Sequence, residues 1–184
     1  MGLRRWLFAG AWLILTALST TSSCAQEPLL DYQAKGEYLP KLALFADWPK
    51  SALPKDKAPL VIGILGNDPF GPGLDAALAS QHVGGRSLRI QRFQSAADVL
   101  DGTCHLLFIC MSEKEKVADI LQALRGRPIL TVADQNRFCL RGGMINFIND
   151  SGKLRFEVNV DAAAASGITL SAKFLQVARI TASR

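Results

Sequence analysis

The chain has 184 residues, of which 49% are hydrophobic and 20% are charged, and its formal net charge at pH 7 is +5. This length and composition exclude a disordered protein and a small disulfide scaffold, and they predict a globular protein with a substantial core. The basic residues are scattered among acidic ones without interleaved aromatic residues, which argues against nucleic-acid binding.

The first 25 residues have the order of a secretory signal peptide. Two arginines precede the apolar stretch Trp6–Leu18, and the small, polar stretch Ser19–Ala25 follows it. We expect cleavage after Ala25. An uncleaved anchor is the less favoured alternative, because the apolar run is shorter than the roughly 20 residues of a membrane span, and lipidation at Cys24 is also less favoured. Cleavage lowers Lys+Arg from 21 to 19 against 16 acids, a net charge of +3 on one exported domain over residues 26–184.

The first part of the mature chain predicts a helix. Gln26–Leu30 is expected to be a loose terminus, and Tyr32–Trp48 has apolar residues at helical spacing. Pro40 predicts either a kink in this helix or a helix that begins near Leu39.

A strand and a turn come next. Leu60–Leu65 is almost continuously apolar, which is typical of a strand buried on both faces. Gly66–Phe70 is interpreted as a strand-to-helix turn in which Asp68 caps the helix and Pro69 begins it. This glycine-rich stretch matches neither the dinucleotide fingerprint nor the P-loop spacing, so it does not predict a phosphate site.

Strands and helices then alternate to the end of the sheet. The expected elements are strands at Arg86–Phe93, His105–Met111 and Pro128–Ala133, helices at Ser95–Leu100 and Ser112–Leu124, and a loop or short helix at Asp134–Arg141. Buried strands that alternate with helices indicate a parallel sheet covered on both faces. We therefore predict an α/β three-layer sandwich, Rossmann-like, with a largely parallel sheet and a C-terminal antiparallel hairpin.

Two β-prone segments flank the turn-forming run Asn149–Gly152 and predict this hairpin. We expect Ile148 to lie opposite Lys153. Side-chain alternation then places on one face, toward the core, Ile145, Phe147, Leu154, Phe156 and Val158. The other face carries Asn146, Arg155 and Glu157, which we expect near a partner or dimer surface; an ordinary solvated face is the alternative.

The sequence contains few groups that could perform catalysis. His82 and His105 are its only histidines, and neither the GxSxG nor the CxxC pattern occurs. His105 opens an apolar strand, where a structural role is more common than a catalytic one. We expect a protein that is not an enzyme and that holds no metal.

Three cysteines remain after cleavage: Cys104, Cys110 and Cys139. An odd number allows one bridge with a free thiol, three thiols, or an intermolecular bond. Cys104 and Cys110 bracket one strand about 20 Å long, which is too far for a bridge. Cys110 and Cys139 both follow the C-terminal ends of strands, so this pair is favoured over Cys104 with Cys139. Three buried free thiols are the equally weighted alternative.

Several strings resemble one family when their order is considered. They are YQAKGEYLPKLALFADWP, LVIGILGNDPFGPGLD, CHLLFI, GRPILTVAD, GGMINF and RFEVN, and together they cover nearly the whole mature chain. In this order they resemble the YfiR-type family of bacterial periplasmic proteins.

The resemblance implies a dimeric α/β regulator of the periplasm that has no cofactor or catalytic activity. Such proteins bind the periplasmic sensor domain of a membrane-anchored diguanylate cyclase of the YfiN type and repress it, which lowers cyclic di-GMP and biofilm formation. An outer-membrane lipoprotein of the YfiB type sequesters the repressor. A response to redox state or envelope stress is also implied.

The cysteines depart from the family pattern. Cys104 and Cys139 match family cysteine positions, but Gly63 and Asn146 stand where their partners are expected. This departure argues against redox control by the two bridges of the family. A bridge that involves Cys110 would be specific to this chain.

A small-ligand-binding module is the alternative function. Open α/β sheets bind ligands at the C-terminal ends of their parallel strands. In this chain Gly66, Asn67, Asp68 and Phe70 would line such a pocket.

Overall fold

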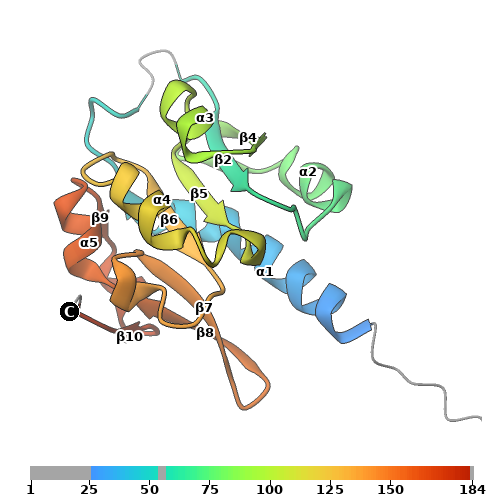
Figure 1. The fold of residues 1–184 in the computed structure, drawn as a ribbon. Coiled ribbons are helices and arrows are strands. Elements are labelled where there is room, and N and C mark those ends of the chain that lie inside the picture. The colour runs from blue at the N-terminus through green and yellow to red at the C-terminus, as the bar shows by residue number, and fades with distance from the viewer. Residues whose placement is uncertain (1–25, 54–56, 183–184) are drawn as a thin grey trace, which may run out of the picture.

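The computed structural model describes residues 26–53 and 57–182, so the expected signal peptide and Cys24 lie outside the described residues. The main strands are β2 (Leu60–Leu65), β3 (His82–Val83), β4 (Arg86–Phe93), β5 (Leu106–Ile109), β6 (Leu130–Ala133), β7 (Ile145–Asp150), β8 (Lys153–Val158) and β10 (Arg179–Ile180). They form one sheet in the order β10-β8-β7-β6-β5-β2-β4-β3 (Figure 1). Neighbouring strands are parallel except β7 with β8 and β3 with β4. The predicted α/β class with a largely parallel sheet and a C-terminal hairpin is confirmed.

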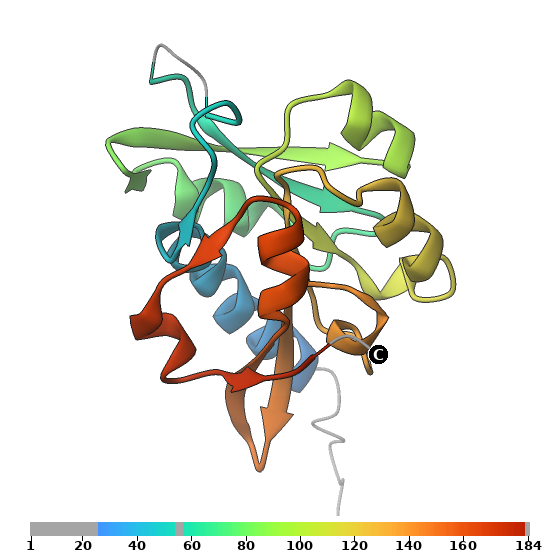
Figure 2. The ribbon, with the colours of Figure 1, turned by 90° about the vertical axis from the view of Figure 1, so that its left-hand side faces the viewer.

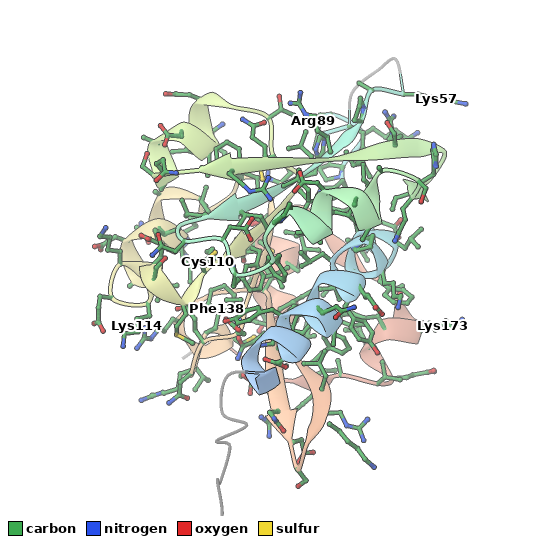
Figure 3. The ribbon with its side chains drawn as sticks, turned by 90° about the vertical axis from the view of Figure 1, so that its right-hand side faces the viewer. Lys57, Arg89, Cys110, Lys114, Phe138 and Lys173 are labelled. Carbon is green, nitrogen blue, oxygen red and sulfur yellow. The ribbon has the colours of Figure 1, made fainter. Side chains whose placement is uncertain are left out.

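Helices cover both faces of the central strands. The two longer helices of one face are α1 (Gln26–Leu44) and α2 (Pro72–Leu78), and α1 crosses that face in Figure 3. On the other face lie α3 (Ala96–Asp101) and α4 (Val117–Ala123). Every residue of β2, β5 and β6 is buried, as expected for strands with two covered faces. Among the described helices, none combines the length and apolar character needed to cross a membrane.

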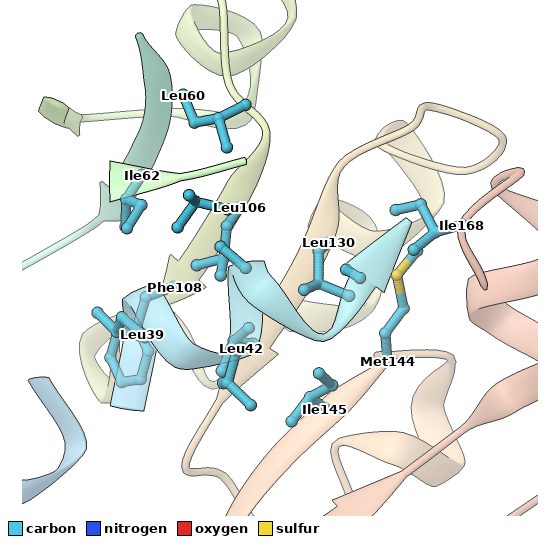
Figure 4. Packing of buried hydrophobic residues seen from close by; sticks show 14 of the residues in the cluster. Leu39, Leu42, Leu60, Ile62, Leu106, Phe108, Leu130, Met144, Ile145 and Ile168 are labelled. Carbon is cyan, nitrogen blue, oxygen red and sulfur yellow. The ribbon is translucent and has the colours of Figure 1, made fainter. Parts of the chain in front are cut away.

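The buried residues form two clusters, one on each face of the sheet. The first joins α1 to the sheet and includes Leu39, Leu42, Ile62, Leu106, Phe108 and Leu130 (Figure 4). The second lies under α3 and α4 and includes Leu65, Val99, Leu107, Val117 and Phe138. Phe147 and Val158 of the hairpin belong to the first cluster, whereas the second contains no residue of β7 or β8. The apolar packing of the hairpin is therefore confined to one face.

Smaller elements complete the fold. They are β1 (Ala46–Asp47), which pairs antiparallel with β9 (Thr169–Leu170), the helices α5 (Val160–Ala165) and α6 (Ala172–Leu175), and the 3-10 turns η1 (Met111–Glu113) and η2 (Cys139–Arg141).

Three boundaries differ from the sequence predictions. Helix α1 already begins at Gln26 and continues through Pro40, so neither the loose terminus nor a start near Leu39 is correct. Helix α2 begins at Pro72 and not at Pro69, because Asp68 binds the Phe70 N–H and Arg92 instead of capping a helix. The expected helix over 112–124 is split into η1 and α4.

The hairpin has a tighter turn than expected. Asp150 pairs with Lys153, and Ser151 and Gly152 form the loop with φ values of 53° and 80°. Two positive φ angles in a two-residue loop are typical of a type I′ turn, which matches the twist of the strands. The expected pairing of Ile148 with Lys153 is therefore wrong by two residues. Because side chains alternate with period two, this error leaves every side chain on its predicted face.

Candidate functional site: the open face of the hairpin

One face of the hairpin is not covered by a core cluster, and we call it the open face. Its residues alternate with the buried ones and are Asn146, Ile148, Asp150, Lys153, Arg155 and Glu157. The tip of the hairpin projects from the body of the molecule in both ribbon views (Figures 1 and 2). The open face is consequently accessible to a partner near the tip of the hairpin.

Asn146 lies on this face but is not exposed. Only 2% of its surface is accessible. Its Oδ1 accepts the N–H of Gln135 at 3.0 Å, and its Nδ2 donates to the carbonyl of Gln135 at 2.9 Å. The amide thus satisfies both main-chain groups of one loop residue, which is a structural function. The expectation that Asn146 lies at a partner surface does not agree with this burial.

Glu157 and Arg155 differ in their surroundings. Glu157 accepts hydrogen bonds from Arg179 at 3.3 Å and from Thr181 at 3.2 Å, and its side chain is 15% exposed. Arg155 is exposed, and so is Lys153, two residues earlier on the same face. Within the described residues, neither of these two cations forms an ion pair. Sequence reasoning missed Lys153, although the same alternation that selected Arg155 would have found it.

A groove of about 410 Å³ runs between the hairpin and the loop after β6, and we call it the hairpin groove. It is lined by Asp134, Gln135, Asn136, Arg137, Leu140, Asn146, Phe147, Ile148, Asn149, Asp150, Glu157 and Arg179. Most of these side chains are polar or charged, and Arg137 has a left-handed φ of 60°. The open face and the hairpin groove form one continuous polar surface.

A buried ion pair connects α1 to the end of β6. Lys35 is 7% exposed and binds Asp134 at 2.8 Å, and it also contacts Asp31 one helical turn earlier. Burial and the nearby Asp134 raise the pKa of Tyr32 well above its ordinary value. One side-chain oxygen each of Asp134 and Gln135 is buried without a hydrogen-bond partner in the described structure. Polar groups therefore gather at the carboxyl end of β6.

The three thiols are free and buried. Burial is the main cause that raises the pKa of Cys104, Cys110 and Cys139 to about 12 each. They remain protonated near neutral pH, and a protonated thiol is a poor nucleophile. The favoured bond between Cys110 and Cys139 is not formed: Cys110 packs in the first core cluster, whereas the Cys139 Sγ lies 3.3 Å from the carbonyl oxygen of Glu157.

Cys104 shows why the position of Gly63 matters. The Cys104 Sγ lies against Gly63, where an added Cβ would be only 2.8 Å from the sulfur. A cysteine at position 63 would thus be next to Cys104, but this chain has no side chain there. Gly63 therefore occupies the position at which the family resemblance places a partner for Cys104, and this chain lacks that partner.

The turn proposed as a ligand pocket is occupied by side chains of the protein. The Asn67 N–H donates to Ser112 Oγ at 3.0 Å, and Asp68 binds Arg92 at 2.7 Å. Phe70 packs between Tyr32 and Phe108, with ring-centre distances of 5.6 and 4.9 Å. Neither the hairpin groove nor a second groove, which is lined by residues of α4, η2 and α5, contains residues of Gly66–Phe70.

His105 is buried and structural. Its Nδ1 accepts the Val61 N–H at 3.0 Å, and its carbonyl accepts the indole N–H of Trp48 at 3.2 Å. Burial lowers the pKa of His105 below its ordinary value. Among the described residues, no group of three or more His, Cys, Asp or Glu side chains is placed to hold a metal ion.

In a comparison with known families, a family model described as YfiR/HmsC-like matches residues 32–179, which include most of α1, the central strands and the whole hairpin. The resemblance seen in the ordered strings of the sequence is thereby confirmed.

Proposed function

We propose that this chain, which belongs to the YfiR/HmsC-like family, represses a membrane-anchored diguanylate cyclase by binding its periplasmic sensor domain. The family consists of periplasmic, non-catalytic regulators of cyclic di-GMP signalling. The observation that carries the proposal is the match over residues 32–179, because it covers the central sheet together with the hairpin. The cyclase as direct partner is our inference.

The open face of the hairpin is the surface that we assign to this partner. Arg155 is exposed there, and Glu157 is held next to it by Arg179. Asn146 supports the surface from below, because its amide holds the loop that forms the other wall of the hairpin groove.

Further partners follow from the same proposal. An outer-membrane lipoprotein of the YfiB type would compete with the cyclase for the repressor, and the repressor itself would act as a homodimer. Redox gating receives no support from the thiols, because all three are buried and have raised pKa values. We expect partner binding to be independent of reductant.

A binding measurement tests the proposal. The mature protein, residues 26–184, is immobilised and exposed to the purified periplasmic domain of the membrane diguanylate cyclase encoded nearest to it, with and without reductant. We expect saturable binding of similar affinity in both conditions. The absence of binding in both conditions would refute the proposal, and binding lost on reduction would restore a role for the cysteines.

A small-ligand-binding module is the second candidate. The observation that favours it is the hairpin groove at the carboxyl end of β6, which Asp134 and Gln135 line; each of them has one buried side-chain oxygen without a hydrogen-bond partner among the described residues. This location replaces the turn at Gly66–Phe70, which its own side chains fill. Native mass spectrometry of the protein purified from the periplasm would show a bound small molecule if this candidate is correct.

A further inference from the structure

Strand β8 has one edge that the sheet leaves partly open. On one side it pairs with β7 along its whole length. On the other side, β10 pairs with it only at Glu157 and Val158. Among the described residues, Lys153–Phe156 therefore have no strand neighbour on the outer side. In Figure 2 this part of the hairpin extends beyond the C-terminal segment.

Two hydrogen bonds show which main-chain groups point outward at this edge. The Asn159 N–H donates toward β7, to the Met144 carbonyl at 2.8 Å, whereas the Val158 carbonyl accepts from Thr181 on the outer side, also at 2.8 Å. Main-chain groups alternate in direction along an antiparallel strand, so Leu154 also directs its N–H and C=O outward. Unpaired groups of this kind form a template for an added strand.

The charge of this region is opposite to that of the remaining chain. Residues 137–184 contain seven Lys+Arg and three Asp+Glu, a net charge of +4. Residues 26–136 contain twelve Lys+Arg and thirteen Asp+Glu, a net charge of −1. Lys153 and Arg155 lie beside the open edge and form no ion pair among the described residues. The adjoining hairpin groove has mixed charge, because Arg137 and Arg179 line it together with Asp134, Asp150 and Glu157, and Glu157 is paired with Arg179. The two unpaired cations at the edge itself therefore attract acidic groups.

We propose that the outer edge of β8 binds an extended, acidic segment of a partner protein, which adds to the sheet as a further strand. Its main chain pairs with Leu154, and its carboxylates meet Lys153 and Arg155. A second copy of this chain would bring like charges to the same edge, and lipid headgroups would not use the main-chain groups. The inference rests on the proposed function in that the partner is a protein.

A peptide selection tests the edge without the cyclase. A random peptide library displayed on phage is selected on the mature wild-type protein and on the Lys153→Glu/Arg155→Glu variant. A matched control is Arg89→Glu/Arg127→Glu, which changes the same charge at exposed sites; Arg89 lies far from the hairpin in Figure 3. We expect acidic peptides from the wild type and the control, and none from the Lys153/Arg155 variant. No enrichment, or the same peptides from all three proteins, would overturn the inference.

Amide hydrogen exchange on the selected complex identifies strand addition. We expect the Leu154 amide to exchange fast in the free protein and to become at least about tenfold slower when an acidic peptide is bound, because strand pairing protects the amide. The amide of Asn159, already bonded to Met144, serves as the internal control. Unchanged exchange at Leu154 would overturn the strand-addition model.

Binding of the cyclase domain to the wild type and to both variants distinguishes this inference from the proposed function. If it binds the wild type, we expect the Lys153/Arg155 variant to bind at least about tenfold more weakly at low salt, and the control variant to bind unchanged. If both variants bind the cyclase domain equally well, the repressor proposal stands and the proposed strand addition at the β8 edge is refuted. If the cyclase domain does not bind but acidic peptides do, the repressor proposal fails and the edge remains supported. Charge-dependent binding to phosphatidylglycerol vesicles without any selected peptide would replace the inference by a lipid surface.

Discussion

Strands β5 and β8 belong to one sheet, but they have very different surroundings. All four residues of β5 are buried, with strands on both edges and helices over both faces. Strand β8 has its core-facing residues packed, whereas Lys153 and Arg155 on its other face are exposed, and part of its edge is open. The comparison shows where the covering layers stop: at the hairpin end of the sheet, where side chains and part of a strand edge are left exposed. The predictions below test this difference.

The largest effect is expected in the central sheet. Phe108 is fully buried, and its ring contacts Phe70 and Phe147 at centre distances of 4.9 and 6.4 Å. Phe108→Ala should lower the free energy of unfolding by about 3–5 kcal/mol, because it creates a cavity between the sheet and α1. Urea denaturation measures the loss. The hairpin counterpart, Leu154→Ala at a half-buried position, should lose clearly less; equal losses would contradict the comparison.

Overpacking gives the next largest effect. A Cβ at Gly63 would lie 2.8 Å from Cys104, Leu107 and Phe93 atoms, so Gly63→Ala should cost about 1–3 kcal/mol of stability. Gly73→Ala is the matched control, since no atom lies within 4 Å of its added Cβ and the residue is part of α2. We expect the control to be neutral or slightly stabilising. Thermal unfolding measures the stability of both variants. A Gly63→Ala variant as stable as the wild type would show that the side chains of the second core cluster shift to make room for the added methyl group.

Acid should weaken the central sheet through His105. The folded state lowers the pKa of this group, since burial disfavours the cation, and protonation of Nδ1 would remove the acceptor of the Val61 N–H. Its contribution to stability is therefore complete above the unfolded pKa of about 6.5 and is lost as pH falls through the lower folded value. The midpoint temperature should drop more between pH 7.5 and 5 for the wild type than for His105→Gln.

The exposed His82 provides the control for this effect. His82→Gln should reproduce the wild-type dependence on pH, because its side chain is accessible to solvent. A pH dependence that is identical in the wild type and in His105→Gln would assign the acid response to other groups.

The smallest effect on stability is expected at the open edge. Lys153→Glu/Arg155→Glu should change the free energy of unfolding by no more than about 0.5 kcal/mol, because both side chains are exposed and form no ion pair in the described structure. Partner binding should nevertheless be lost. Denaturation and binding are measured on the same preparation. A large loss of stability would mean that these charges maintain the hairpin fold.

Sequence reasoning succeeded where a pattern is local and periodic. The apolar run Leu60–Leu65 predicted a strand with two covered faces, and the alternation in the hairpin predicted which residues point to the core. It was wrong where a single hydrogen bond decides, as for Asp68, which binds Arg92 from another strand instead of capping a helix. Similarly, alternation assigned Asn146 to the correct face, but the expectation that this face is exposed there was wrong, because Gln135 holds the Asn146 amide inside.

The sequence by itself determined the α/β class, the family and the faces of the strands, because periodic burial and ordered motifs are properties of the chain. Only the tertiary structure decided that the three thiols lie apart in buried surroundings, that Lys153 and Arg155 have no ion-pair partner among the described residues, and that β10 leaves the edge of β8 open. The physical reason is that each of these facts depends on which distant segments meet. Such contacts are set by the packing of the whole sheet and its helices, not by any local stretch.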